Sequence, residues 1–186
     1  MAGYAFAKYQ FRGREKVFNL LLATMMVPAQ VTMIPVFLLL KKIGLLDTYW
    51  GIIIPGSASV FAIFLMRQFM VAIPNDYIEA ARIDGCNEWQ IYLKLILPLS
   101  KPVLATLTIF TFMGSWNDFL WPLIVMFREK MYTLPVALAN LSGGAHEADY
   151  GILMAGAMVV VIPIVIVFLL MQRQYIRGIS MTGLKG

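Results

Sequence analysis

Few residues in this 186-residue chain have side chains that could carry out chemistry. Cys86 is its one cysteine and His146 its one histidine, so the chain can form no internal disulfide and no cluster of thiolate or imidazole metal ligands. The phosphate-binding sequence Gly-x-x-x-x-Gly-Lys-Ser/Thr also does not occur in it. The sequence therefore predicts no catalytic residue, no metal site and no cofactor, and we do not expect this chain to be an enzyme.

Asp118 is the one charged residue in the apolar run between Pro102 and Phe127. An ionisable group in a membrane segment is by default a candidate functional group. The 16 residues from Pro102 to Asn117 cover roughly 24 Å of helix, however, which places Asp118 near a membrane interface and not at the midplane. We expect Asp118 to cap a helix or anchor the interface in preference to relaying protons.

Three uncharged polar residues, Gln30, Thr32 and Asn117, also lie within apolar runs. Their side chains could offer hydrogen bonds to a solute that crosses the membrane. The same residue types more often stabilise the packing of helices in membranes. Together with Asp118 they are the possible pathway residues of this chain, with both interpretations open.

Residues 74–97 carry the signals of two short helices joined by a tight turn. Asp76, followed three residues later by Glu79, is typical of a capping box at a helix start. Asp84 and Gly85 then predict the end of this helix, because glycine adopts a left-handed conformation without steric cost. The second helix is expected to follow Gly85 almost immediately.

Asn87 and Gln90 repeat the capping pattern at the start of this second helix. The helix is expected to run to Leu97, where Pro98 would interrupt it because proline lacks the backbone N–H. The sequence thus predicts a helix, a glycine turn and a second helix.

The connection between Arg67 and Lys101 carries four basic and four acidic residues and so has no net charge. Such a surface matches lipid headgroups and phosphates poorly, whereas balanced charge can orient a protein partner. Apolar residues could then supply buried anchors at the interface; these are Ile78, Ile83, Trp89 and Tyr92. A solvated loop that merely connects two spans is an equally good interpretation of the composition.

The elements that must position these residues are apolar. The chain is 60% hydrophobic and 13% charged, against about 25% charged in a typical soluble domain, so lipid is the expected environment. A membrane helix needs about 20 apolar residues. Pro28 and Pro35 predict a bend in the first span. We expect an all-α, polytopic bundle forming a single domain over 1–186, with spans at 17–40, 48–66, 102–122 and 150–172, an inner loop at 74–97 and an outer loop at 127–149.

The distribution of Lys and Arg predicts the orientation of these four spans. With both termini of this chain in the cytoplasm, 11 of the 15 basic residues lie on the inner side and 4 on the outer side. This agrees with the excess of positive charge in cytoplasmic loops. The net charge of +5 is therefore interpreted as a topology signal and contact with lipid headgroups, with no nucleic-acid partner.

At this point the residues resemble a known motif. Glu79-Ala80-Ala81, then Gly85, Leu95 and Leu97-Pro98 at the spacing found here resemble the EAA motif of permease subunits of ABC importers. Leu95 stands where that family usually has isoleucine, and Cys86 where it commonly has alanine or serine. Further segments resemble the maltose-type carbohydrate permeases; these are 4–7, 45–51, 114–119, 132–135 and 184–186.

This resemblance implies an ABC importer permease fold, in the bacterial inner membrane, with short cytoplasmic coupling helices. It implies as partners a second permease subunit, two cytoplasmic ATP-binding subunits and an extracytoplasmic solute-binding protein, with the ATPase activity in a separate subunit. The implied coupling residues are Glu79, Ala80, Ala81, Asp84, Gly85, Leu97 and Pro98. Glu79 could equally serve in helix capping alone.

The resemblance also bears on the outer loop and on the length of the chain. Residues 141–144 are Leu141, Ser142, Gly143 and Gly144, which the resemblance makes a contact loop for the binding protein, although an idle loop has the same composition. These permeases usually have six spans, so residues 3–11 are expected to be the end of a truncated span.

The expected solute is a sugar or oligosaccharide. A glycerol phosphate or a polyol is the alternative within the same family. The alternatives from another functional class are an ion-coupled carrier and a membrane scaffold subunit. A carrier is expected to place charges at the membrane midplane, where this chain has none by sequence.

Overall fold

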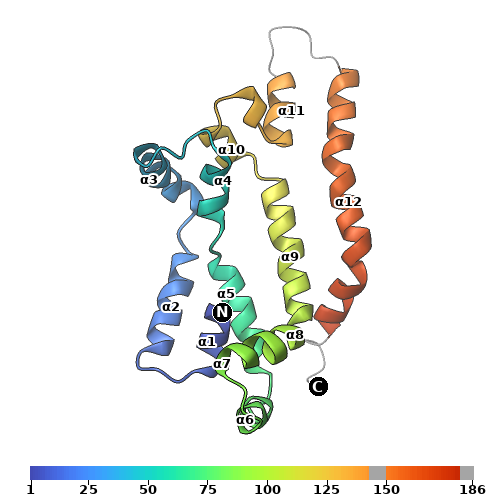
Figure 1. Cartoon of the computed structure of the whole chain (residues 1–186). Helices are drawn as coiled ribbons and strands as arrows, with labels where there is room; N and C mark the ends of the chain where they lie inside the picture. Colours follow the sequence, from blue (N-terminus) through green and yellow to red (C-terminus); the bar gives the residue numbers. More distant parts are fainter. Residues whose placement is uncertain (143–149, 181–186) are drawn as a thin grey trace. The chain divides into compact units, whose positions relative to one another are not determined.

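In the computed structural model the polypeptide is helical wherever regular structure occurs within the described residues, which are 1–142 and 150–180. The side chains of 142 and 171–180 are not described. The elements in chain order are α1 Ala2–Lys8, α2 Arg14–Thr24, α3 Ala29–Lys42, α4 Tyr49–Gly56, α5 Val60–Val71, α6 Asp76–Ile83, α7 Glu88–Gln90, the π-helix η1 Ile91–Ile96, α8 Leu97–Leu99, α9 Lys101–Trp116, α10 Leu120–Val125, the 3₁₀ helix η2 Glu129–Met131, α11 Leu134–Ser142 and α12 Tyr150–Ser180 (Figure 1).

The chain forms two compact units, each built from separate stretches of sequence. The first comprises 1–27, 59–108 and 173–186, and the second comprises 28–58 and 109–172. Each unit has its own buried apolar cluster.

In the first unit α1 packs directly on α5 (Figure 1). The approach is close because Gly3 has no side chain: a Cβ atom at this position would lie 2.6 Å from the Cβ of Met66 and 3.2 Å from the backbone N of Arg67. Tyr4 and Met70, which is fully buried, belong to the apolar cluster at this contact. Small residues at helix contacts allow such proximity in membrane proteins.

Arg67 on α5 joins α1 and α2 to this contact. Its guanidinium lies 3.9 Å from the ring centroid of Phe18 and donates to the carboxylate of Glu15 at 2.7 and 2.9 Å. Its Nε also donates to the carbonyl of Phe6 at 3.3 Å. One charged side chain thus holds three helices of the first unit together.

In the second unit the link between α3 and α4 packs against α10 and the residues that follow it. Leu40, Val125 and Met126 are the buried centre of this contact. The indole Nε1 of Trp121 donates to the carbonyl of Gly51 at 3.1 Å, which ties α10 to α4. Trp116 makes a similar bond to the carbonyl of Val160 in α12, at 2.9 Å.

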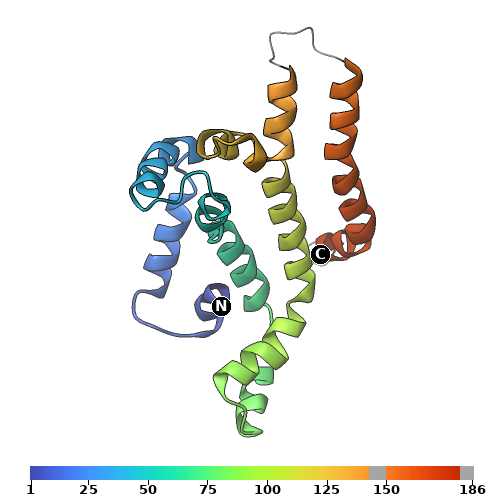
Figure 2. The same cartoon turned by 45° about the horizontal axis from the view of Figure 1, so that its top comes forward.

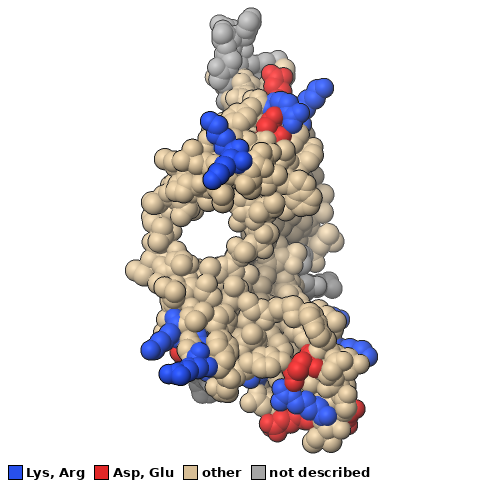
Figure 3. Space-filling view, turned by 60° about the vertical axis from the view of Figure 1, so that its left-hand side comes forward, with Lys and Arg blue, Asp and Glu red and all other residues tan. Residues whose placement is uncertain are grey.

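The helices are long and apolar enough to cross a membrane in two places, 49–71 and 150–170. The count rises to four if the helix pairs 14–42 and 88–116 each form one broken span. Large apolar side chains are exposed along these segments, and Figure 3 shows a broad surface without Lys, Arg, Asp or Glu. The structure is therefore an all-helical protein of membrane character, and the number of complete spans stays a prediction.

Three of the predicted spans contain interruptions, of which the sequence predicted only the first. Helix ends at residue 24 and begins again at 29, ends at 56 and begins again at 60, and ends at 116 and begins again at 120. The first break precedes Pro28, as expected from the proline. At the second break Ser59 caps α5 by accepting from the N–H of Ala62 at 3.2 Å, whereas at the third break the N-cap residue Phe119 makes no side-chain cap bond.

Candidate functional site

The loop at 74–97 adopts the predicted arrangement of a helix, a glycine turn and a second helix (Figure 2). Helix α6 ends at Ile83, and Gly85 follows with φ of +80°. A Cβ atom at Gly85 would have no neighbour within 4 Å, so the requirement for glycine at this position is conformational and not spatial.

The expected capping by Asp76 is wrong. Asn75 is the N-cap of α6, no side chain caps it, and Asp76 and Glu79 both lie in the first helical turn. Carboxylates in this turn still interact favourably with the positive end of the helix dipole. The side chain of Glu79 is exposed, so it is available to a partner.

The second capping pattern is confirmed. The N–H of Gln90 donates to Oδ1 of Asn87 at 2.9 Å, and the N–H of Asn87 donates to Oε1 of Gln90 at the same distance. Both bonds form within four consecutive residues, which is why the sequence predicted them correctly.

The expected interruption at Pro98 is also wrong. The helix continues through Pro98 because residues 91–96 form a π-helix, whose wider turn changes the hydrogen-bond register in front of the proline. The bend comes instead at Ser100, where the helices on either side meet at 74°. Ser100 is fully buried and its hydroxyl donates to the carbonyl of Ile96 at 2.7 Å.

The apolar residues of the loop divide between the interior and the surface. Ile78 is buried in the cluster of the first unit and Tyr92 is half-buried, so neither is free to anchor a partner as expected. Ile83 is 86% exposed and Trp89 60% exposed, and Tyr77 is exposed as well. Acidic and basic side chains are interspersed over this loop at the bottom of Figure 3.

The residues named from the motif also divide between the surface and the interior. Ala80, Asp84 and Pro98 are exposed, like Glu79, whereas Ala81 packs against the buried cluster and Leu97 is half-buried. The small side chain of Ala81 therefore serves the seating of α6 on the rest of the unit.

Two residues that sequence reasoning did not single out tie α1 to this loop. Lys8 donates through Nζ to the carbonyl of Ile73 and, at 2.9 Å, to Oδ1 of Asn75. Tyr9 donates its hydroxyl to the carboxylate of Glu88. The contacts join residues more than 60 positions apart, so no local pattern could have indicated them.

Glu88 is also bonded to α6, because Arg82 Nε donates to Oε1 of Glu88 at 2.8 Å. The bonds from Arg82 and Tyr9 stabilise the carboxylate and lower the pKa of Glu88 below its ordinary value. Glu88 therefore links α6, α7 and the end of α1 as an ionised group at neutral pH.

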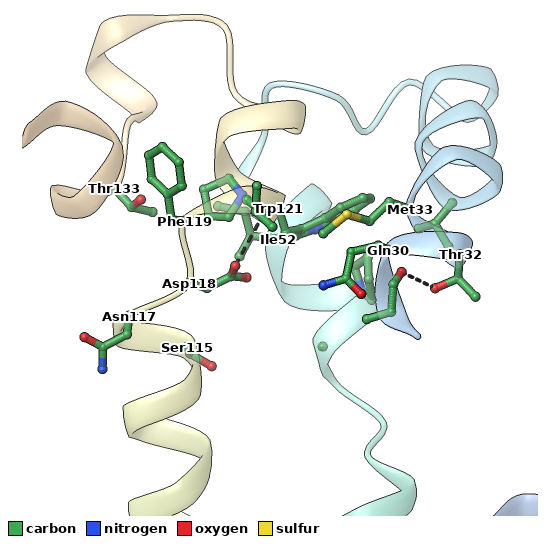
Figure 4. Close-up of a pocket in the computed structure, with 16 residues that line it drawn as sticks. Gln30, Thr32, Met33, Ile52, Ser115, Asn117, Asp118, Phe119, Trp121 and Thr133 are labelled. Atoms are coloured by element: carbon green, nitrogen blue, oxygen red, sulfur yellow. Dashed lines mark hydrogen bonds between the residues drawn. The ribbon is translucent and has the colours of Figure 1, made fainter. Parts of the chain in front are cut away.

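All four possible pathway residues lie around one cavity in the second unit. The cavity has a volume of about 690 Å³ and sixteen lining residues. Helix α3 contributes Gln30 and Thr32, and the segment that joins α9 to α10 contributes Asn117 and Asp118. Figure 4 shows Gln30 and Asp118 on opposite walls, directed into the same space.

The polar side chains of the cavity differ in the hydrogen bonds that they form within the protein. Oδ1 of Asp118 accepts from the backbone N–H of Trp121 at 3.5 Å, while the N-cap position of α10 is Phe119, which makes no side-chain cap bond, so the capping role of Asp118 stays a prediction. Thr32 and Asn117 donate to carbonyls of their own helices, those of Ala29 and Met113, at 2.8 Å each. Figure 4 shows Asn117 directed away from Asp118.

The outer loop contains two helices that the sequence did not indicate. They are η2 and α11, and Leu141 and Ser142 form the end of α11. Gly143 and Gly144, expected at a loop tip, and His146 lie outside the described residues.

The family described as "Binding-protein-dependent transport system inner membrane component" matches residues 1–181. The chain belongs to this family. Such membership makes it an inner-membrane component of an ABC transport system, a family not known for catalysis.

Among relatives of this inner-membrane component, the arabinooligosaccharide transport permease AraQ of Halalkalibacterium halodurans is 42% identical over 186 residues, which are 100% of this chain and 66% of the relative. The lactose transport permease LacG of Rhizobium radiobacter is 38% identical over 178 residues, 96% of this chain and 65% of the relative. The sn-glycerol-3-phosphate transport permease UgpE of Yersinia pestis is 36% identical over 180 residues, 96% and 64% respectively.

A solved structure agrees with this assignment. It is a bacterial ABC transporter that imports the acidic polysaccharide alginate, and its matching chain is 34% identical, with a TM-score of 0.79. The match covers 92% of this chain and 65% of that one. The inner-membrane component described here thus spans slightly under two thirds of the length of the proteins that it matches.

Proposed function

We propose that this inner-membrane component is a permease subunit of a binding-protein-dependent importer of sugars or oligosaccharides, coupled to ATP hydrolysis in a partner subunit. The observation that carries the proposal is the helix–Gly85–helix loop, exposed and balanced in charge, in a chain of this family. The names of the relatives AraQ and LacG support a sugar as the solute.

In this proposal α6 and the turn after it dock on the ATP-binding subunit. Ile83 and Trp89 supply the apolar contact, because both are largely exposed. The carboxylate of Glu79 meets a cation of the partner, while Gly85 holds the angle between α6 and α7. Closure of two ATP-binding subunits would then move the spans through this rigid loop.

The remaining partners follow from the same proposal. Four spans, at 17–40, 48–66, 102–122 and 150–172, place both termini of the chain in the cytoplasm in a single permease domain. A second permease subunit completes the pathway. Residues 141–144 and their surroundings face outward and contact the solute-binding protein.

A second candidate solute is sn-glycerol 3-phosphate. The observation in its favour is the 36% identity to the permease UgpE. Both candidates share the coupling loop, so the experiment on the loop does not separate them. Membership of the importer family favours either of them over an ion-coupled carrier.

The coupling role is tested with Gly85→Ala in the transporter assembled with its partner subunits in proteoliposomes. A side chain at left-handed φ costs about 1–2 kcal/mol, which corresponds to about a 5- to 30-fold loss of the docked loop conformation. We expect a comparable loss of solute uptake driven by ATP. Membrane insertion should be normal, because no atom lies within 4 Å of the added Cβ.

Gly44→Ala is the matched control. Gly44 also has a positive φ, of +72°, and no neighbour within 4 Å of an added Cβ, but it lies between α3 and α4. The control therefore imposes the same type of strain away from the loop and should retain uptake. If Gly85→Ala and Gly44→Ala transport equally well, the loop does not couple ATP hydrolysis to transport.

A further inference from the structure

The cavity of the second unit contains polar side chains that no neighbouring group satisfies. Among the described residues, the amide of Gln30 and the hydroxyl of Ser115 form no hydrogen bond, and one acceptor oxygen of Asp118 is likewise free. Figure 4 shows Ser115 and Gln30 directed into the space that Asp118 faces. Polar groups within an apolar segment are tolerated where they line a water-filled or solute-filled space.

The apolar part of the lining is aromatic on one side. Trp121 and Phe119 both border the cavity, and the indole of Trp121 is held in place by its bond to the carbonyl of Gly51 at 3.1 Å. Binding sites for small molecules typically combine such rigid apolar surfaces with a few convergent polar groups, within volumes of about 300–1,000 Å³. The volume of about 690 Å³ fits this range.

The charged lining of the cavity is acidic only. Asp118 is an acid, and none of the other described lining residues is Lys, Arg or His. A phosphate or carboxylate on a ligand would therefore meet a like charge, with no cation to compensate it at low dielectric. Hydroxyl groups, by contrast, can donate to Asp118 and exchange hydrogen bonds with Gln30 and Ser115.

We infer that this cavity is a binding site within the subunit itself for an uncharged, hydroxyl-rich solute, and that it disfavours anionic ones. Asp118 and Gln30 bind hydroxyl groups from opposite walls, and Trp121 packs against the apolar face of the solute. The inference rests on the proposed function and narrows its solute class. It separates this chain from relatives that carry an acidic polysaccharide or a glycerol phosphate.

The test is equilibrium binding to the whole transporter, with its second permease subunit and ATP-binding subunits, in lipid nanodiscs and without a binding protein. The probes are radiolabelled maltotriose, arabinotriose and lactose, and the competitors are a galacturonate trisaccharide and sn-glycerol 3-phosphate. At least one neutral probe should bind, and each anionic competitor should displace it at least about tenfold less well than the unlabelled neutral sugar.

Two variants localise the site. Gln30→Leu removes hydrogen-bonding groups at similar size and should weaken binding of the neutral sugar by about 2- to 12-fold. Asp118→Asn keeps the shape, removes the charge and should narrow the difference between neutral and anionic sugars. Gln68→Leu, an equivalent change at an exposed position of α5 outside the cavity, is the matched control and should bind as the unaltered protein does.

The inference is overturned if none of the three neutral probes binds, or if anionic competitors are as effective as neutral sugar. It is also overturned if Gln30→Leu and Asp118→Asn leave both affinities unchanged. Stronger displacement by a cationic glucosamine oligomer would assign the cavity to cations and reject the inference. Because this measurement needs no ATP hydrolysis, its failure is distinct from a failure of coupling at Gly85.

Discussion

In the second unit Arg128 binds both the carboxylate and the carbonyl of Asp47, a residue in a left-handed backbone conformation. Asp47 has a φ of +57°, unusual for a residue other than glycine. The N–H groups of Phe127 and Arg128 donate to Oδ1 of Asp47 at 3.0 and 3.2 Å, and Arg128 donates to its carbonyl at 2.8 Å. The Nε of Arg128 forms an ion pair with the same carboxylate. These contacts join the segment between α3 and α4 to the segment between α10 and η2.

The first prediction concerns substitution of this residue. Asp47→Asn should lower the thermal stability of the purified protein less than Asp47→Ala, because asparagine tolerates the left-handed conformation and still accepts the two backbone N–H bonds. Asp47→Ala should also cost more than Arg128→Ala, because Arg128→Ala removes the side-chain bonds of Arg128 and leaves the two backbone N–H bonds to Asp47 in place. Melting curves in detergent measure the order of the three melting temperatures. The prediction is contradicted if all three variants are as stable as the unaltered protein.

The second prediction concerns pH. Partial desolvation acts to raise the pKa of Asp47, but the bonds from Phe127 and Arg128 outweigh it and leave the pKa below its ordinary value. A carboxyl group with a lowered pKa contributes stability that is present above its unfolded pKa of about 4 and is lost as the pH falls through the folded value. The difference in melting temperature between Asp47→Ala and the unaltered protein should therefore be constant from pH 5 to 8 and shrink only below about pH 4. A difference that already disappears between pH 7 and 5 would contradict this assignment.

The third prediction compares two glycines at helix contacts. At Gly3 an added Cβ meets the Cβ of Met66 at 2.6 Å and backbone atoms at 3.2 Å, whereas at Gly156 it meets the flexible end of Leu138, Cδ1, at 2.7 Å. Gly3→Ala should destabilise the protein by about 1–3 kcal/mol because α1 and α5 must move apart. Gly156→Ala should cost less, since the leucine can change rotamer.

Chemical or thermal unfolding in the same detergent compares the two variants. Gly114→Ala serves as the control, because a Cβ at Gly114 has no neighbour within 4 Å. A smaller loss for Gly3→Ala than for Gly156→Ala would show that the α1–α5 contact is not rigid.

The fourth prediction concerns the link from α1 to the loop at 74–97. Tyr9→Phe removes the hydroxyl that donates to Glu88 and keeps the ring that packs against Tyr4, with centroids 5.5 Å apart. We expect faster hydrogen exchange of the backbone amides in residues 76–90, by about 2- to 10-fold for one lost hydrogen bond. Tyr132→Phe, which alters an exposed tyrosine bond in the other unit, is the control. Unchanged exchange in Tyr9→Phe would mean that the bond from Tyr9 to Glu88 does not support the loop.

Local features of this molecule were predictable from the sequence. The apolar runs, the turn at Gly85 and the capping box of Asn87 and Gln90 depend on residues within a few positions of one another, so pattern and propensity suffice to predict them. The motif around Glu79 predicted the family for the same reason, since it lies in one short segment. The predicted break at Pro98 failed because a proline alone does not end a helix: Pro35 and Pro163 also lie inside helices, and Pro98 directly follows a π-helix.

Tertiary structure decided which of these residues meet. Gln30 and Asp118 come together in one cavity only because α3, α4 and α10 pack around Leu40 and Val125, and Tyr9 reaches Glu88 only because Gly3 lets α1 lie against α5. Ile78 was a candidate anchor by composition and became part of the interior when α6 was seated. The sequence by itself therefore determined the membrane character, the helix–glycine–helix loop and the family, which arise from short-range order. The cavity of the second unit and the support of the loop arise from contacts between distant segments, whose energies depend on packing that no local pattern contains.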